Sequence, residues 1–496
     1  MVETNMLRAR RRWSAASPAS ALFLSAMSAL ALGTGLALTA GPAAAQTSTN
    51  PSTRVSTPLG VALPLNVTAV PPLPAPEALL PNLFGLDRLR AAGVALLLDN
   101  TNEFAGIISG PQKGATNSGQ YGFETDIDWQ KLAGLTGFST HTVVVGRYGI
   151  PASRIFGDNL NPSQEIYGGG GNVAVHLVYA YGEETLAGGR FDITAGRIPF
   201  LNDFSSSPLY CNFMNNSFCG NPKASSDNPA HSSYPDGNWA TRVRVRPTKS
   251  TYIQTGIFFS EENIYSAGNG FRSGFRFSSA QINGEAFPVE LGYEPLVGPD
   301  KLPGHYKLGF AYDNVNHSDG YFDIDGSALG ETGLPPRQRK GTTAAWVLFD
   351  QMLLRNGPGD TNGLIVFGGY YHNDPSTSTR NDQYEIALLD QGFWKARPKD
   401  LVGVAFNYLQ VSNALTRTEE LQQELGLPIT GNGAQFYDDS TPGIQSHTMD
   451  IEANYQIHVM RGVTFAPDFQ YFIRPNAQTN LHNAALLGFK THIELF

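Results

Sequence analysis

Three arginines, Arg242, Arg244 and Arg246, occupy alternate positions of one short stretch, with valines between them. Side chains two residues apart share a face of a strand, so this spacing predicts a column of arginines on one side of a strand. A guanidinium carries five fixed N–H donors. Asp192 and Asp203 stand earlier in the chain and can supply acceptors nearby. The pattern predicts a surface that binds polar solutes through hydrogen bonds.

Motifs that would indicate catalysis are missing from the sequence. The glycines at 168–171 lack the Lys-Ser/Thr of a phosphate-binding loop, which favours a flexible loop end. The stretch Asp323-Ile324-Asp325-Gly326 begins like a calcium loop but lacks the remaining ligands and the distal Glu. No G-x-S-x-G, H-E-x-x-H or C-x-x-C occurs. We expect no enzyme, no metal site and no cofactor.

The chain has two cysteines, Cys211 and Cys219, which are close enough in sequence to close one small loop. Both follow a segment that resembles an export signal, so we expect them to meet an oxidising compartment and to form a disulfide. A pair of free buried thiols is the alternative.

The first residues have the pattern of a secretory signal. Arg8, Arg10, Arg11 and Arg12 precede an apolar run that closes on Ala43-Ala44-Ala45. We expect residues 1–45 to be a signal peptide, and its removal changes the net charge from −9 to −12. An acidic chain is a poor partner for nucleic acid. The rest of the chain has no apolar run of the ~18 residues that a spanning helix needs.

Residues 46–82 are rich in Pro, Thr and Ala and predict an extended linker or short plug. Residues 83–92 predict a short amphipathic helix. From about residue 94 the apolar positions alternate with period two, which indicates strands. One example is Tyr121, Phe123 and Ile127, which alternate with Glu124 and Asp126. We therefore assign residues 83–496 to one all-β domain.

About sixteen strands are predicted, an even number as in bacterial single-chain barrels. The expected ranges are 94–108, 119–130, 139–149, 171–181, 189–199, 238–246, 251–260, 284–294, 304–314, 341–354, 362–373, 381–390, 400–411, 446–458, 462–474 and 484–496. Connections after even-numbered strands are short, as at 461–462, whereas those after odd-numbered strands include the long stretches 201–237, 315–340 and 412–445. Short periplasmic turns and long extracellular loops are typical of an outer-membrane barrel.

A stack of soluble sandwiches would also bury an apolar face, but it would not sort its connections by length in this way. A closed transmembrane antiparallel up-and-down β-barrel instead turns its apolar face to lipid and its polar face to a water-filled lumen, with every backbone group paired. We therefore expect Val175, Leu177, Tyr455 and Phe469 to face lipid. Tyr179 and Tyr181 follow in the same alternation as Val175 and Leu177.

Several segments in order resemble the carbohydrate-selective porins of the OprB family, sixteen-stranded monomeric sugar channels. They are Leu83-Phe84-Gly85-Leu86-Asp87-Arg88-Leu89-Arg90-Ala91-Ala92-Gly93-Val94, Gly189-Arg190-Phe191 with Gly196-Arg197, the Cys211/Cys219 loop, Tyr234-Pro235-Asp236-Gly237-Asn238-Trp239-Ala240, and Gly488-Phe489-Lys490-Thr491-His492-Ile493-Glu494. The first segment departs from the family by lacking its Trp and paired Gly. The C-terminus also departs, because Phe496 alternates out of phase with Leu487 to Leu495, so that either a bulge restores the phase or Leu495 replaces the aromatic residue.

The resemblance implies a sugar path lined by charged and aromatic residues, which we assign to Arg197, Trp239, Arg242 and Arg244. Asp192 and Asp203 would accept hydrogen bonds there, in a constriction made by the loop 201–237. The alternative is that these are ordinary solvated lumen residues that contribute no selectivity. We expect a monomer in the Gram-negative outer membrane that contacts lipid and lipopolysaccharide and admits sugars passively. The alternatives are a general or anion-selective porin, or a barrel that serves as a platform for an adhesin or enzyme.

Overall fold

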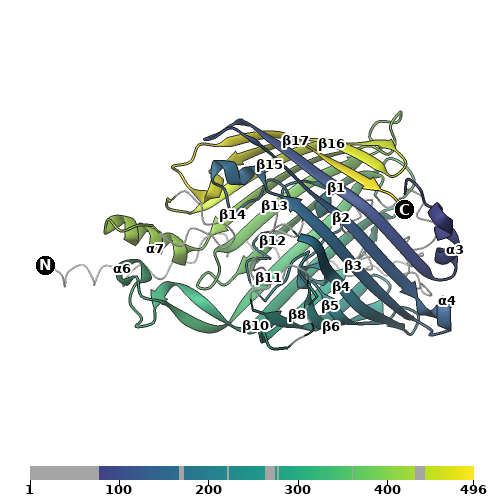
Figure 1. Cartoon of the computed structure of the whole chain (residues 1–496), viewed down its shortest axis with the longest axis horizontal. Helices are drawn as coiled ribbons and strands as arrows, with labels where there is room; N and C mark the ends of the chain where they lie inside the picture. Colours follow the sequence, from purple (N-terminus) through teal and green to yellow (C-terminus); the bar gives the residue numbers. More distant parts are fainter. Residues whose placement is uncertain are drawn as a thin grey trace. The chain divides into compact units, whose positions relative to one another are not determined.

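The computed structural model describes residues 78–166, 173–219, 223–228, 230–262, 274–275, 277, 279–359, 361–429 and 442–496. All of them belong to one compact unit, Ala43–Phe496. The other unit, Met1–Pro42, lies outside the described residues, as do the predicted signal peptide and most of the predicted linker. Within the described unit, antiparallel strands form one closed barrel (Figure 1).

Sixteen strands close the barrel, which confirms the predicted all-β fold. Neighbours in sequence are neighbours in the sheet, and β1 pairs with both β2 and β17 to complete the ring. The strands are β1 (Val94–Ser109), β2 (Ala115–Asp128), β3 (Phe138–Gly149), β4 (Val173–Leu186), β5 (Phe191–Ile198), β6 (Asn238–Thr248), β7 (Thr251–Glu261), β8 (Ile282–Tyr293), β10 (Leu302–Asp323), β11 (Pro336–Arg355), β12 (Gly363–Asn373), β13 (Arg380–Gln391), β14 (Leu401–Val411), β15 (His447–Met460), β16 (Val463–Ile473) and β17 (Ala484–Glu494). The short strand β9 (Leu296–Val297) lies outside the ring and pairs with the start of β10.

The two faces of the barrel differ as the alternation predicts. Outward side chains are apolar and exposed, for example Phe310 at 50% and Ile386 at 50% of their surface. Inward positions on the same strands carry groups such as Asp313 and Glu385, which are buried. Because the ring closes on itself, each of its sixteen described strands is paired on both sides and presents no edge to lipid.

The prediction for the outer face of β4 was partly wrong. Val175 is 52% exposed and Phe469, on β16, is 37% exposed, but Leu177 is only 4% exposed, and Gly274 lies close to the backbone of Leu177. A bulge in the pairing of β3 with β4 then changes the phase. Tyr179, which follows the bulge, is therefore buried in the lumen at 0% exposure. Tyr455 is half-buried on the outer face, where its hydroxyl donates to Asp400.

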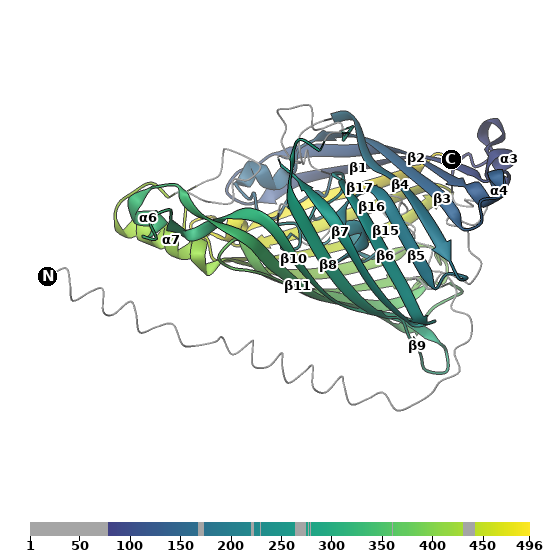
Figure 2. The ribbon, with the colours of Figure 1, turned by 90° about the horizontal axis from the view of Figure 1, so that it is seen from below.

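The stretch 315–340 was predicted as a loop but consists mostly of strand. β10 continues to Asp323 and β11 begins at Pro336, with the small helix α6 (Leu329–Thr332) between them. Helix α7 (Asn413–Glu424) packs against this extension, and the hydroxyl of Thr418 donates to the carbonyl of Gly320 at 2.7 Å. Both helices lie at one end of the barrel (Figure 2). In the hairpin turn, Asp323 Oδ1 accepts from Asp325 N and Ser327 N, so this one oxygen closes the turn.

The opposite end holds the short turns, with α3 (Leu86–Ala91), α4 (Trp129–Ala133) and the C-terminus (Figures 1 and 2). The 3-10 turn η2 (Leu83–Gly85) and α3 match the predicted helix. The register of β17 is unbroken from Leu486 to Glu494, and Leu98 N donates to Phe496 O beyond it. Leu98 O also accepts from Leu495 N, so Leu98 bonds to two successive residues at the C-terminus, as at a β-bulge, which is one of the two alternatives left open for Phe496. The helices in the described part of the chain include no candidate for a membrane-spanning helix.

Candidate functional site

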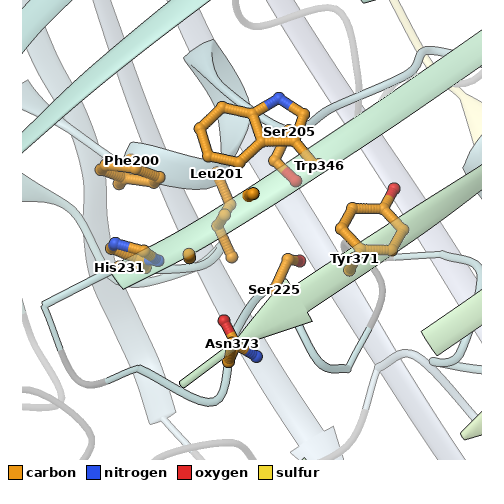
Figure 3. Close-up of a pocket in the computed structure, with 10 residues that line it drawn as sticks. Phe200, Leu201, Ser205, Ser225, His231, Trp346, Tyr371 and Asn373 are labelled. Carbon is orange, nitrogen blue, oxygen red and sulfur yellow. The ribbon is translucent and has the colours of Figure 1, made fainter. Parts of the chain in front are cut away.

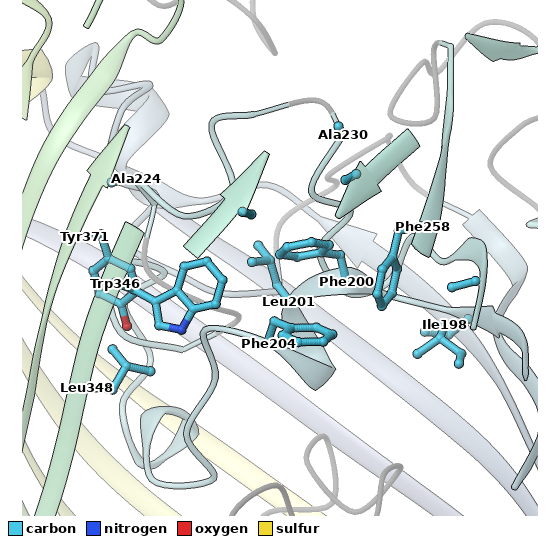
Figure 4. Packing of buried hydrophobic residues seen from close by; sticks show 14 of the residues in the cluster. Ile198, Phe200, Leu201, Phe204, Ala224, Ala230, Phe258, Trp346, Leu348 and Tyr371 are labelled. Carbon is cyan, nitrogen blue, oxygen red and sulfur yellow. The ribbon is translucent and has the colours of Figure 1, made fainter. Parts of the chain in front are cut away.

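The described part of the connection between β5 and β6 (residues 199–219, 223–228 and 230–237), here called the long lumen segment, folds into the barrel. It contains the short helix α5 (Phe200–Asp203) and the 3-10 turn η4 (Tyr210–Asn212). Its apolar side chains pack on inward residues of distant strands (Figure 4). The members of this cluster that Figure 4 labels include Phe200, Leu201, Phe204, Phe258, Trp346, Leu348 and Tyr371. Apolar burial thus holds the segment inside a lumen that is otherwise polar.

The arginine column lies on the inward face of β6, next to the base of the long lumen segment. Arg242 forms ion pairs with Asp192 and, at 3.5 Å, with Asp203, whereas Arg246 pairs with Glu294 at 2.7 Å. The structure therefore brings together four of the six predicted path residues: Asp192, Asp203, Arg242 and Arg244. Two of the three arginines are neutralised by carboxylates of the barrel itself.

Arg244 is held differently from its neighbours in the column. Its Nε donates to Gln254 Oε1 at 2.9 Å, and the guanidinium lies 5.3 Å from the centre of the Tyr252 ring. Its Nη2 is buried and has no hydrogen-bond partner among the described residues. Arg244 thus keeps a hydrogen-bond donor that the described wall and lumen segments do not use.

The carboxyl group of Asp203 is enclosed where the long lumen segment meets β6. Burial raises the pKa of Asp203, although Arg242 and Arg244 both favour its charged form. One carboxylate oxygen of Asp203, Oδ2, has no hydrogen-bond partner among the described residues. The group fastens the segment to the wall mainly through charge.

Glu290 on β8 is a second fastening point that the sequence did not reveal. Its carboxylate accepts from Tyr252 Oη at 2.8 Å, from Trp346 Nε1 at 2.8 Å and from the backbone N of Ser205 at 3.1 Å. Gln254 Nε2 adds a fourth bond at 3.0 Å and also donates to the carbonyl of Asp203. Strands β7, β8 and β11 therefore converge on the start of the segment.

The structure places the other two predicted path residues elsewhere. Trp239 is an odd number of positions from Arg242, so it lies on the outward face of β6, where its ring is 5.7 Å from that of Phe277. The assignment of Trp239 to the sugar path was wrong. Arg197 lies opposite Trp239 in the register, and its guanidinium pairs with Glu261 at 3.1 Å rather than joining the column. The sequence already indicated this placement, because Trp239 and Arg242 are three positions apart and therefore lie on opposite faces of one strand.

Cys211 and Cys219 form a disulfide within the long lumen segment. The turn that they close is fastened to the far wall of the barrel, since Glu452 of β15 accepts from Met214 N at 2.5 Å and from Asn215 N at 2.9 Å. Lys490 of β17 donates to the carbonyl of Phe213 at 3.1 Å. The segment thus crosses the lumen from β8 to β15.

A second connection also enters the lumen, here called the short lumen segment (residues 150–166), and nothing in the sequence predicted it. Its residues Asn161, Ser163 and Gln164 are each 0% exposed. Polar residues of this kind usually indicate a solvated loop. They are buried here because the barrel wall supplies their partners, for example Glu103, whose carbonyl accepts from Gln164 Nε2 at 2.9 Å.

A small cleft of about 10 Å³ lies between the long lumen segment and the wall (Figure 3). This volume is close to the room that one water molecule needs, so the segment fits closely on this side. Burial lowers the pKa of His231 to about 4, which keeps the ring neutral as it stacks on Phe200 at 4.1 Å. The lining residues are Phe200, Leu201, Ser205, Ser225, His231, Ala344, Ala345, Trp346, Tyr371 and Asn373.

The lumen therefore combines fixed charges with a segment of fixed position, and the described residues contain no cluster of His, Cys, Asp or Glu suited to a metal ion. Such an arrangement can filter solutes by size and by hydrogen bonding. The sequence model of the family described as "Carbohydrate-selective porin, OprB family" matches residues 112–495. The chain belongs to this family. Members of the OprB family are channels rather than enzymes, and this chain is an outer-membrane carbohydrate channel of a Gram-negative bacterium.

Individual relatives agree with the family assignment. Porin B of Pseudomonas aeruginosa is 27% identical over 378 residues, 75% of this chain and 80% of that protein. A putative porin of Acinetobacter baylyi, QuiX, is 24% identical over 75% of this chain and 82% of its own length. The high-pH structure of Pseudomonas putida OprB superposes with a TM-score of 0.74 at 25% identity and covers 82% of this chain and 96% of that one.

Proposed function

We propose that this porin selects sugars at the long lumen segment, which acts as the constriction for passive diffusion. The observation that carries the proposal is the fastening of one segment to opposite walls, at Glu290 through Ser205 N and at Glu452 through Met214 N. Because the long lumen segment is hydrogen-bonded to opposite walls of the barrel, its distance from each wall is fixed. The width of the channel opening beside it is therefore fixed as well. Passive selection then needs only weak contacts, because tight binding would prevent release.

Within this constriction, Arg244 is the proposed hydrogen-bond donor to sugar hydroxyls. Its support is the buried Nη2 that lacks a partner among the described residues. Arg242, Asp192 and Asp203 have a different proposed part: their ion pairs keep the base of the segment on β6. A donor fixed in a strand loses little conformational freedom when a solute binds.

The pairing of charges argues against an anion-selective pore. Arg242 pairs with Asp192, Arg246 with Glu294, and Arg380 with Asp227 at 2.5 Å. Positive charges that are matched by carboxylates leave little net potential to attract anions. Because the chain without the predicted signal peptide carries a net charge of −12, any residual ion preference is expected to favour cations.

The barrel is proposed to work as a monomer surrounded by lipid and lipopolysaccharide. Both lumen segments and all strands of the ring come from this one chain. The outward apolar side chains form a surface suited to acyl chains.

Liposome swelling with uncharged sugars of rising size tests the proposal. Purified protein should admit monosaccharides and exclude sugars above a sharp size limit, and the reversal potential in a salt gradient should show no anion preference. Equal entry of sugars of all sizes would contradict a fixed constriction. A strong anion preference would instead favour the anion-selective alternative.

A further inference from the structure

We infer that the short lumen segment and the long lumen segment move as one body, and that wall residues contacting both of them set the size of the channel. The inference rests on the proposed function, in which the long lumen segment is the constriction. It adds a second part to that constriction and names its positioning residues: Asp450, Gln470, Arg380 and the pair Glu103–Lys490.

The two segments are joined directly through their backbones. Glu165 N of the short segment donates to Met214 O of the long segment at 2.7 Å. Asn216 N of the long segment donates back to Pro162 O at 2.9 Å. These bonds run in both directions at one place, so neither segment can slide past the other without breaking both.

Two wall side chains on neighbouring strands each bind both segments. Asp450 Oδ1 of β15 accepts from Asn161 Nδ2 of the short segment at 2.8 Å and from Ser217 Oγ of the long segment at 3.2 Å. Gln470 of β16 uses both ends of its amide in the same way. Its Nε2 donates to Ser163 O at 2.8 Å, and its Oε1 accepts from Asn215 Nδ2 at 3.1 Å.

Arg380, at the start of β13, also binds both segments, and its contact with the long segment is an ion pair. Its Nη1 donates to Leu160 O of the short segment at 3.0 Å, and its Nε donates to Asp227 Oδ1 of the long segment at 2.7 Å. Across the lumen, Glu103 of β1 accepts from Ile166 N at 3.0 Å and pairs with Lys490 at 3.2 Å. Lys490 in turn holds the carbonyl of Phe213.

Four of these bridging residues are buried, since Asp450, Gln470 and Glu103 are each 0% exposed and Arg380 is 3% exposed, whereas the side chain of Lys490 is 12% exposed. A buried polar group that loses its partner keeps its full desolvation cost. If one segment moved alone, buried polar groups on three sides of the lumen would lose hydrogen-bond partners. If the two segments move together, the hydrogen bonds between them are kept. The opening is therefore a property of both segments.

The experiment compares Asn161→Ala, which removes a bond of the short segment to Asp450, with Ser217→Ala, which removes the bond of the long segment to the same atom. Single-channel recordings in planar bilayers should show that both variants visit the same altered conductance level. One hydrogen bond corresponds to a factor of about two to ten in an equilibrium, so each variant should visit that level about two to ten times more often than the parent. The double variant should show the same level.

Thr342→Ala is the matched control, because Thr342 is a buried polar residue of the lumen face whose hydroxyl is 2.6 Å from Thr377 Oγ1, outside both segments. Its recordings should equal those of the parent. Different levels for Asn161→Ala and Ser217→Ala, or an unchanged Asn161→Ala channel, would overturn the inference. Parent channels that carry ions but exclude every sugar would count against the proposed function and leave the coupling test intact. The experiment leaves Asp450 itself unchanged, so its outcome does not depend on whether an Asp450→Ala variant would fold.

Discussion

The outer surface and the lumen of this barrel follow different rules. Outside, the side of each residue follows from its position in a strand of period two, as for Phe310 on β10 and Ile386 on β13, which are both half exposed. Inside, groups far apart in sequence complete one another, as Asn161 and Asp450 do. The outer face is thus set by local alternation, whereas the lumen is set by long-range pairing. The predictions below probe that difference, from the largest expected effect to the smallest.

Arg242→Ala should be the most damaging single change on the lumen side. It leaves Asp192 and Asp203 buried without their shared cation, and breaking a buried pair costs about 3–5 kcal/mol. Denaturant unfolding in lipid vesicles measures the loss. Arg339→Ala is the control, since its pair with Asp319 is partly exposed and should be worth less than about 1 kcal/mol. Equal losses for the two variants would mean that the lumen pair is solvated.

Phe469→Arg tests the outer face near the middle of β16. Arginine at the bilayer midplane of a barrel costs about 2–4 kcal/mol. The same unfolding assay should register this loss, with Phe469→Leu as the control close to the parent. Stability that is unaffected by the arginine would show that the inside and outside of the barrel are assigned the wrong way round.

Asp158, in the short lumen segment, should make stability depend on pH. Burial raises its pKa to about 6, above the ~3.9 of an unfolded Asp. The folded chain therefore holds a proton that the unfolded chain releases, and stability falls as pH rises from about 4 to about 6. Asp158→Asn should remove this fall, worth about 3 kcal/mol at most. Identical pH profiles for parent and variant would contradict the burial of this carboxyl group.

Loss of the Cys211–Cys219 bond should have a smaller effect. The two residues are eight positions apart, and closing so short a loop contributes about 2.5 kcal/mol. The double Cys→Ser variant should therefore still assemble but unfold at lower denaturant. Thiol labelling of denatured, unreduced parent protein provides a check, and two reactive thiols would show that the bond is absent.

The strands were predictable because a lipid-facing barrel repeats its apolar side chains every second residue. The strand prediction failed where this apolar alternation is absent or interrupted. From Asn316 to Asp319 four polar residues follow one another in β10, so the alternation is lost and the stretch after Asn314 resembled a loop. A bulge near Val178 turned Tyr179 inward, and no local signal marks a bulge of this kind.

The site was predictable only in part. Arg242 and Arg244 are two positions apart and therefore share a face of β6. Asp192 could be placed beside them because its strand, β5, precedes β6 and pairs with it. Glu290 could not be identified, because its partners Ser205 and Trp346 come from distant parts of the chain. The short lumen segment was missed for the same reason, since its burial depends on partners in β1, β15 and β16.

The graded block of ion current by sugar tests the central claim most directly. In planar bilayers, a monosaccharide should reduce the parent current with a defined half-block concentration. Arg244→Ala removes a donor worth at most about 1.5–3 kcal/mol, and less in a wet lumen. We predict that its ion conductance stays at or above that of the parent while half-block moves to a higher sugar concentration. An unchanged half-block concentration in a well-folded Arg244→Ala channel would contradict the role assigned to this arginine.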